Sequence, residues 1–388
     1  MRLRIRSIWL VLLVLALDTA PAAAADEVLA WNVTTLEALA AGGQNNIVMT
    51  RTLAMVHLAV HDALNSISRR YEPYALQARA QPGADPAAAS AAAARDVLVQ
   101  LIPRYGSAAQ QAKATEIVER AYAAGLAHLP DATAKDHGIA AGRAAAEAML
   151  VLRKSDGAFA PAQYTPGTAP GQWRPTPNPV PAHPSVPDPV MAVGNLPAMQ
   201  PQWGQVTPFT LLTAGQLRLP PPPALGSEDY ARDYNEVKRV GGKDSVVRTP
   251  EQAETVRYWY EGSPQSWNRI GRVVAGPRRL DAWEQARLFA LLNAAMADGF
   301  IAAADTRYLY NVWRPVTAIR AGDADGNDAT TPDPAWESYV NTPSMPDYPS
   351  THSVLGAAAT AVLARFVGTD QVGFTMTSGA PFAGITRS

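Results

Sequence analysis

The apolar residues of this chain recur mostly at spacings of three and four, which is the period of an α-helix. From Ile47 to Ile67 they define one helical face, and Asp131 stands where a helix needs an N-terminal cap. No series of strands with hairpin turns is visible. The pattern therefore predicts an all-α helical bundle, with two helices in 28–67 divided at 41–46 and further helices at 85–102, 107–126, 131–154, 227–240, 250–260, 281–313 and 350–366.

Proline and glycine interrupt this pattern in one long stretch. Between about 157 and 223 the composition changes to Pro, Gly and isolated aromatic residues, and the stretch ends in four consecutive prolines. Helices cannot continue through such a segment, because proline lacks the backbone N–H. We expect a Pro-rich loop insertion that runs over the surface of the bundle, held by Trp173, Trp203 and Phe209.

The N-terminus has the pattern of a secretory signal peptide. Three arginines precede an apolar run from Ile8 to Leu17, and small residues follow up to Ala25. The run is too short to cross a bilayer, which needs about 20 residues. We expect residues 1–25 to be removed, leaving a secreted or periplasmic single domain at 26–388. No later run of spanning length is visible, so no transmembrane segment is expected.

Charge and cysteine content exclude several classes of function. Lys plus Arg is 33 and Asp plus Glu is 34, so no basic excess favours nucleic acid as a partner. The absence of cysteine excludes disulfides, Cys-ligated metal sites and thiol catalysis. Only five of the 33 basic residues are lysines, so an anion site would be built from guanidinium groups.

The predicted helix at 281–313 carries two arginines near its end. Arg307 and Arg314 are seven residues apart, almost two turns, so on one helix both side chains share a face with Cα atoms about 10 Å apart. Asn311 joins that face. Two guanidinium groups at this spacing can bracket a tetrahedral oxyanion. The alternative is a pair of solvated arginines at a helix C-terminus, where the helix dipole favours cations.

A second candidate element opens the last predicted helix. Ser350 or Thr351 can cap it, and its first N–H groups lack partners within the helix. Such an N-terminus attracts anions, and His352 is placed to give a proton to a leaving oxygen or to hold a water. The alternative is an ordinary helix start with an incidental histidine.

Both elements resemble signatures of the superfamily of type 2 phosphatidic acid phosphatases and vanadium haloperoxidases. The stretch from Arg307 to Pro315 is similar to the first signature, a lysine followed after six residues by Arg-Pro, and 349–352 is similar to the second, Pro-Ser-Gly-His. Together with Trp313, the strings are most similar to the bacterial haloperoxidase-like branch. Only these two short motifs are diagnostic, although the resemblance extends over the mature chain.

The resemblance implies a helical bundle, with two packed four-helix bundles as one form of it, around a site for vanadate or phosphate. Arg307 and Arg314 would bind the oxyanion, Ser350 and Thr351 would add donors, and His352 would be the acid–base residue. The substrates would be halide and peroxide in a vanadate-dependent haloperoxidase, or a phosphomonoester in an acid phosphatase that uses phosphohistidine and no cofactor. A non-catalytic exported oxyanion-binding protein is the third alternative, and a homodimer is expected only by analogy.

The chain departs from the family pattern at three places. Arg307 replaces a lysine and Thr351 replaces a glycine, which changes the donor geometry and crowds the backbone. No histidine follows His352, so the third signature, Ser-Arg-x-x-x-Gly-x-His, is absent. That histidine is the nucleophile or the vanadium ligand. We expect the domain to be C-terminally incomplete and the 388-residue chain to be inactive or nearly so, without a direct metal ligand.

Other residues are weaker candidates. His57 and His61 have the spacing at which two imidazoles on a helix can share a metal. The alternative is that one is hydrogen-bonded in the core and the other lies near an interface. Asp298 and Asp305 could be acid–base carboxylates, or Asp305 an ion-pair partner of an arginine. Trp313 could line a halide pocket or belong to the core.

Overall fold

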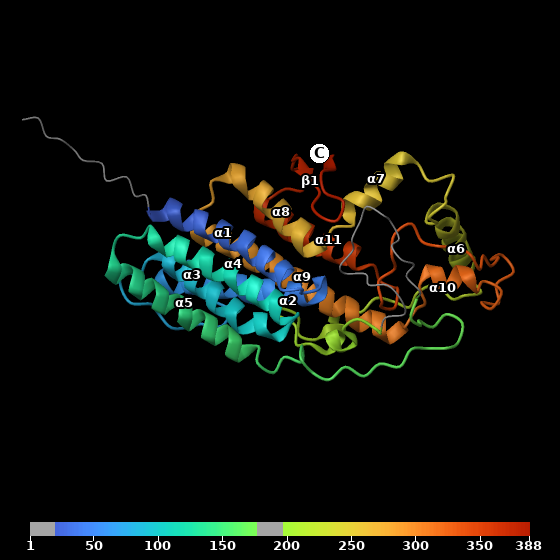
Figure 1. The fold of residues 1–388 in the computed structure, drawn as a ribbon, viewed down its shortest axis with the longest axis horizontal. Coiled ribbons are helices and arrows are strands. Elements are labelled where there is room, and N and C mark those ends of the chain that lie inside the picture. The colour runs from blue at the N-terminus through green and yellow to red at the C-terminus, as the bar shows by residue number, and fades with distance from the viewer. Residues whose placement is uncertain (1–19, 177–196) are drawn as a thin grey trace, which may run out of the picture.

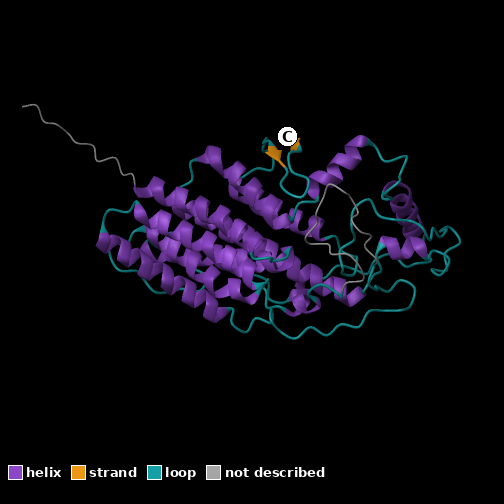
Figure 2. Cartoon of the chain, in the orientation of Figure 1, coloured by secondary structure: helices purple, strands orange, loops and turns teal. Residues whose placement is uncertain are grey.

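Helices form most of the described structure, which confirms the all-α class. The computed structural model describes residues 20–176 and 197–388 (Figures 1 and 2). One antiparallel pair, β1 (Met376–Thr377) with β2 (Thr386–Arg387), lies near the C-terminus. The α-helices are α1 (Ala20–Ala41), α2 (Asn46–Ile67), α3 (Pro86–Leu101), α4 (Ala108–Ala127), α5 (Ala132–Leu152), α6 (Glu228–Val240), α7 (Pro250–Trp259), α8 (Ser263–Ala275), α9 (Ala282–Tyr310), α10 (Pro315–Arg320) and α11 (Thr351–Val367).

The predicted helix starts are confirmed by their caps. The Asp131 carboxylate accepts a hydrogen bond from the backbone N–H of Ala134 at 3.0 Å, and Asp85 caps α3 in the same way. Asp281 and Glu284 form a capping box at the start of α9. Two helices were missed. The short α10 and the polar α8 have few apolar positions, and α8 buries Asn268 as well as Ile270 and Val274.

Helices α2 and α9 form the centre of the molecule. Every residue of α2 from Ile47 to Ser66 is buried, so the prediction of a single apolar face was wrong. The reason is that α2 packs against α3, α5, α8 and α9 and has no side left for solvent. In α9 most of the predicted stripe is buried, but Leu291 is 42% exposed. Figure 1 shows α1–α5 and α9 running lengthwise together, with α6 and α10 at the far end.

Two glycines bring α3 and α5 close together. A Cβ at Gly142 would lie 2.3 Å from the carbonyl oxygen of Ala89, and one at Gly138 would lie 2.4 Å from that of Asp85. Both distances are impossible for a real side chain. The order of these contacts shows that the two helices run parallel. The alanine-rich surface of α3 and the glycines of α5 therefore replace large side chains by direct backbone approach.

The central helices are as long and apolar as membrane-spanning helices. Both α2 and α9 pass that test of length and composition, which corrects the expectation that no run of spanning length follows the N-terminal one. Their apolar stretches are 100% and 78% buried inside the fold. This apolar character is explained by core packing. The predicted signal peptide lies mostly outside the described residues, and α1 begins at Ala20, before the expected cleavage point.

The described parts of the Pro-rich insertion pack on the bundle as expected. Trp173, Trp203 and Phe209 are buried, and residues 177–196 lie outside the described residues. Asp298 of α9 fixes this segment, since its carboxylate accepts hydrogen bonds from the backbone N–H groups of Phe209, Thr210 and Leu211 at 2.6–3.0 Å. Asp298 is therefore committed to holding the loop and is not a free acid–base carboxylate.

Replacing Asp298 by alanine should destabilise the protein. The change leaves three backbone N–H groups without their charged acceptor, and charge-assisted hydrogen bonds contribute about 1.5–3 kcal/mol each. We expect the free energy of unfolding, measured with urea, to fall by about 3 kcal/mol. The control is Asp370→Ala, an exposed carboxylate that contacts only the neighbouring Gln371 side chain. Equal effects of the two substitutions would contradict the assignment.

Candidate functional site

The two arginines of the first motif do not lie on one helix, so that prediction was wrong. Helix α9 ends at Tyr310, and Asn311 takes the left-handed conformation with φ 52°, which closes the helix. Arg314 has extended backbone before Pro315, the first residue of α10. Proline disfavours helical backbone in the residue before it. The motif is therefore a helix end, a turn and a new helix start.

The loop at 345–349 nevertheless brings the two arginines together. Arg307 donates from Nε to the carbonyl of Asp347 at 2.9 Å and from Nη2 to that of Pro349, and its Nη1 lies 2.6 Å from the Met345 sulfur. Arg314 donates from Nε to the carbonyl of Met345 at 2.7 Å and from Nη1 to the Asp347 carboxylate at 2.9 Å. Both guanidinium groups thus bind the segment that leads into α11.

This cluster is buried and has an excess of positive charge. Arg307 is only 2% exposed, and burial together with the neighbouring Arg314 charge lowers its pKa to about 9. Burial also lowers the pKa of Arg314, while Asp347 opposes the shift. Asp347 is the only carboxylate that pairs with either guanidinium among the described residues. An additional anion would relieve this repulsion between buried like charges.

His352 lies at the start of α11, as expected from the second motif. Ser350 is the N-cap, and its hydroxyl accepts from the backbone N–H of Ser353 at 3.3 Å. The His352 Nε2 lies 3.4 Å from the carbonyl oxygen of Glu261. Desolvation of the ring lowers the pKa of His352, although part of the residue is exposed.

A cavity of about 90 Å³ lies beside His352 and Thr351. Met345, which contacts Arg307, is also in its wall, so this residue separates the cavity from the arginines. The two arginines are not among the lining residues. The structure therefore places the arginines in one cluster and His352 in an adjacent one. The cavity is lined by Asn46, Ile47, Met199, Ser263, Pro264, Phe300, Pro343, Met345, Thr351 and His352.

The three supporting residues of the first motif have other contacts. The Asn311 side chain accepts a hydrogen bond from the Tyr164 hydroxyl, and it does not share a helical face with Arg307. Trp313 is 2% exposed and belongs to a small apolar cluster with Tyr234 and Trp336. Asp305 makes an ion pair with Arg218 of the Pro-rich insertion at 2.8 Å.

Sequence reasoning missed the residues that hold this region in place. Met345 and Asp347 come from a turn-rich stretch without a recognisable motif. Glu261 is buried and forms an ion pair with Arg269, and its Oε2 accepts from the backbone N–H of Gly379. Its carbonyl faces His352. In the sequence, Glu261 is only a carboxylate between two helices. Its burial is visible only in the tertiary structure.

His57 and His61 do not form a metal pair with any third ligand. Among residues 20–176 and 197–388 no group of three or more His, Asp or Glu side chains could hold an ion. His57 is buried, its Nε2 contacts Asn32 at 2.9 Å, and Asn32 also bonds Asn268. His61 contacts the carbonyl of Glu72. Both imidazoles therefore belong to the polar core.

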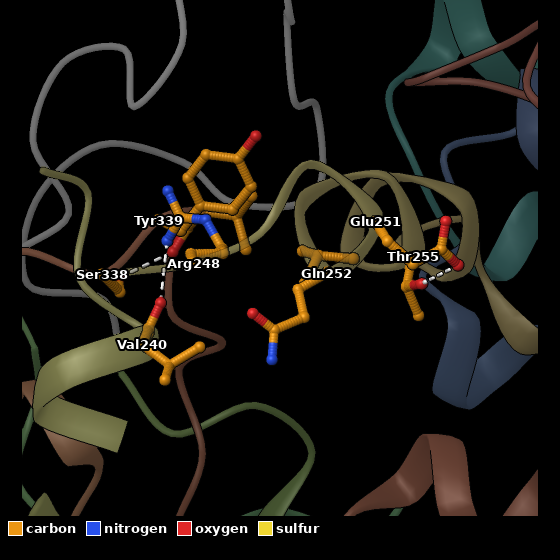
Figure 3. Close-up of a pocket in the computed structure, with 10 residues that line it drawn as sticks. Val240, Arg248, Glu251, Gln252, Thr255, Ser338 and Tyr339 are labelled. Atoms are coloured by element: carbon orange, nitrogen blue, oxygen red, sulfur yellow. Dashed lines mark hydrogen bonds between the residues drawn. The ribbon is translucent and has the colours of Figure 1, made fainter. Parts of the chain in front are cut away.

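A cavity of about 440 Å³ lies between α6, α7 and Ser338–Val340, away from the arginine cluster (Figure 3). Arg248 donates to the carbonyls of Val240 and Gly242, and its guanidinium lies 3.7 Å from the centre of the Tyr339 ring. These contacts hold the loop against the end of α6. They leave Arg248 with a structural role.

Replacing Arg307 by lysine should destabilise the protein. A single ammonium cannot reach the carbonyls of Asp347 and Pro349 together, and hydrogen bonds from charged groups contribute about 1.5–3 kcal/mol each. We expect the free energy of unfolding to fall by about 2–4 kcal/mol in urea titrations. Arg218→Lys is the matched control, because its pair with Asp305 is half exposed and such pairs contribute less than about 1 kcal/mol.

His57 should make the protein less stable as the pH falls. Burial and the nearby Arg272 lower the pKa of His57 in the folded protein to about 3. In the unfolded chain the imidazole has its ordinary pKa of 6.5, so between these two values only the unfolded chain binds the proton. Stability is full above the ordinary pKa and declines below it, by about 2 kcal/mol between pH 7 and pH 5. His57→Gln should reduce this slope, measured by urea unfolding at several pH values. His137→Gln, in a loop-facing position, should leave it unchanged.

Comparisons with known proteins find relatives in sequence, including a family model that matches part of the second half of the chain, and solved structures with the same fold. Residues 287–385 match the family model described as the VCPO second helical-bundle domain. Vanadium chloroperoxidase of Curvularia inaequalis is 28% identical over 372 residues, which cover 81% of this chain. The chain spans about 60% of the length of that relative.

Solved structures of bacterial proteins have the same fold. The crystal structure described as the first bacterial vanadium-dependent iodoperoxidase has a TM-score of 0.71 at 20% identity, covering 93% of this chain and 85% of the other. A holo-type bacterial vanadium-dependent chloroperoxidase has a TM-score of 0.67 at 18% identity, covering 89% and 85%. The sequence match at residues 287–385 and the shared helical architecture are consistent with the vanadium haloperoxidase superfamily.

Proposed function

We propose that this chain binds a tetrahedral oxyanion, vanadate in a haloperoxidase or phosphate in a phosphatase, between Arg307, Arg314 and the start of α11. One observation carries the proposal. Two guanidinium groups are buried side by side with a single carboxylate between them, directly before the helix that starts with Ser350, Thr351 and His352. Buried cations in excess are stabilised by an anion.

The residues present fit a small oxyanion in charge and in donors. The Nη2 of Arg314 makes no hydrogen bond to a described residue, and the same holds for the backbone N–H groups of Thr351 and His352. Free N–H groups at a helix start favour anions. The adjacent cavity of about 90 Å³ exceeds the roughly 10–15 Å³ that one water requires. The arginines therefore supply the charge, while the start of α11 supplies further donors and borders the adjacent space.

The roles of the residues follow from their surroundings. Arg307 and Arg314 would hold the charge of the anion while keeping the 345–349 loop in place. Desolvation lowers the pKa of His352, which favours the neutral imidazole. The ring of His352 faces the backbone of Glu261 and Trp259, which would orient it for a role in proton transfer. Bound vanadate would supply the Lewis acid that activates peroxide toward halide.

The fuller chemistry of the family requires a group that the 388-residue chain does not contain. No histidine follows His352, so neither a direct imidazole ligand nor a phosphohistidine can come from that part of the sequence. Haloperoxidase chemistry is preferred over phosphatase chemistry because the sequence match and the fold are both those of haloperoxidases.

Binding of orthovanadate, measured by isothermal titration calorimetry, tests the proposal. We expect saturable binding that inorganic phosphate competes with. Arg314→Gln removes a buried donor and a charge and should weaken binding at least about tenfold, since a charge-assisted hydrogen bond contributes about 1.5–3 kcal/mol. Arg218→Gln is the control. It removes an exposed guanidinium of the Pro-rich insertion, which pairs with Asp305 of α9, and this variant should bind orthovanadate like the original protein.

Absence of saturable binding, or equal affinity in Arg314→Gln and the original protein, would contradict the proposed site. The same samples decide between the chemistries. Oxidation of bromide, iodide or chloride with peroxide and vanadate indicates a haloperoxidase, and hydrolysis of p-nitrophenyl phosphate inhibited by vanadate indicates a phosphatase. Binding without either reaction indicates an oxyanion-binding protein.

We also propose export to the periplasm or the extracellular space. The support is the charged N-terminus followed by ten apolar residues and small residues up to Ala25. N-terminal sequencing of the protein produced in a bacterial host tests this, and a mature chain that starts near Asp26 is the expected result. Assembly as a homodimer remains an expectation by analogy, and sedimentation of the purified protein tests it.

A further inference from the structure

A second large cavity lies far along the chain from the proposed oxyanion site. It has a volume of about 730 Å³ and opens between α3 and α5 near their C-terminal ends. Its wall combines cations with apolar side chains. Arg51 of α2 and Arg104 after α3 supply charge, while Val99, Leu150 and Val151 supply apolar surface.

The buried end of this cavity contains more positive than negative charge. The side chains of Arg51, Arg153 and Asp156 are 2%, 3% and 2% exposed, and both arginines pair with the same carboxylate oxygen of Asp156, at 2.7 and 2.8 Å. Desolvation lowers the pKa of Arg153. One carboxylate cannot neutralise two guanidinium groups, so a net charge of +1 remains in a buried place. Such a charge is costly without a further partner.

Two donors in this cluster have no hydrogen-bond partner in the described structure. These are Nη1 of Arg51 and the hydroxyl of Tyr105, both buried. Burial raises the pKa of Tyr105 to about 12, so the hydroxyl keeps its proton at neutral pH. Buried donors without acceptors are rare because each loses its bonds to water. They are suited to an acceptor that is supplied from outside.

Phe159 lies over the charged end of the cavity. The guanidinium carbons of Arg51 and Arg104 lie 5.4 and 4.4 Å from the centre of its ring, and the Tyr105 ring is 5.6 Å away. Phe159 is 39% exposed and Val151 is 67% exposed. Apolar side chains with this exposure next to a buried cation can cover the hydrocarbon part of a ligand.

Two other cations of the wall, Arg95 and Arg143, are already paired, and the wall also contains Lys154 and the carboxylate Glu147. Arg95 makes ion pairs with Asp96 and Glu119, and Arg143 lies 3.7 Å from Asp96. Arg104 and Arg153 also lie at helix C-terminal ends, where the helix dipole favours cations. Arg51 stands inside α2, so the dipole does not explain it. The buried excess charge is therefore centred on Arg51, with the exposed Arg104 beside it.

We propose that this cavity is a second ligand site, for an organic oxyanion with an apolar tail. Its carboxylate or phosphate group binds between Arg51 and Arg104, and its tail lies along Val99, Leu150 and Val151. Bidentate contact with a guanidinium suits both headgroups. The proposal is independent of the oxyanion site at Arg307 and Arg314.

Isothermal titration of the full chain with octanoate, octyl phosphate and inorganic phosphate tests the site. We expect saturable binding of at least one of the two amphiphiles. Inorganic phosphate should bind this site at least about tenfold more weakly, because burying even two CH2 groups contributes about that factor. Equal binding of phosphate and octyl phosphate, or no saturable binding of either amphiphile, would overturn the proposal.

Variants locate the binding. Arg104→Gln should weaken amphiphile binding about two- to fivefold, as expected for a partly exposed charge, and Arg51→Lys about tenfold, because the ammonium keeps the Asp156 pair but loses the spare donor. Arg120→Gln on exposed α4 is the matched control and should bind normally. If Arg51→Lys does not fold, Arg104→Gln and Val151→Asp still test both ends of the cavity. Unchanged binding in these two would overturn the proposal.

A competition experiment separates this site from the proposed oxyanion site. Orthovanadate at saturation should not displace octanoate, and Arg104→Gln should bind orthovanadate like the original protein. Displacement of octanoate by orthovanadate would place it at Arg314 and overturn the second site, while the proposed function would stand. If the protein binds octanoate but does not bind orthovanadate, the proposed function is overturned and the second site stands. A crystal structure with octanoate bound would show the headgroup directly.

Discussion

The contact between two buried guanidinium groups and the 345–349 segment determines how the rest of the site is arranged. Arg307 at the end of α9 and Arg314 before α10 both donate to this segment, which leads directly into α11. Without these bonds, its carbonyl oxygens would be buried without donors. The same two residues therefore fix the helix start that presents Ser350, Thr351 and His352, and keep the positive charge that an oxyanion would use.

The scaffold behind this contact depends on helices that have no solvent side. Helix α2 is buried on every face, and α9 is nearly so, which gives both a rigid position among their neighbours. Some polar atoms inside them bond residues of neighbouring helices, as in the contacts of His57 Nε2 with Asn32 of α1 and of Asn293 with Asn268 of α8. Asp298 connects this core to the Pro-rich insertion. The site therefore rests on helices whose displacement would disrupt the whole core.

Buried arginines occur at two separate places, and each place has fewer carboxylates than cations. Asp347 faces Arg307 and Arg314, and Asp156 faces Arg51 and Arg153. In a protein with only five lysines, guanidinium groups carry most of the positive charge, and they can be buried because each offers several N–H donors to backbone carbonyls. This shared feature supports anion binding at both places.

The sequence by itself determined the helical class and most helix bounds, because caps such as Asp131 and the spacing of apolar residues act over a few positions. It also identified the start of α11 at Ser350. The sequence pattern placed Arg314 on the same helix as Arg307, because the helical spacing continues past Tyr310. In the structure, the left-handed Asn311 ends the helix, and Pro315 keeps Arg314 extended. The sequence pattern also missed α8, whose buried face is partly polar.

Only the tertiary structure decided which residues meet. Met345 and Asp347 became partners of the arginines, Asp305 paired with Arg218, and Asp156 was shared by Arg51 and Arg153. Except for Arg153 with Asp156, these contacts join residues tens of positions apart along the chain. Local spacing has no information about them, because they depend on how helices pack and on which charges that packing buries.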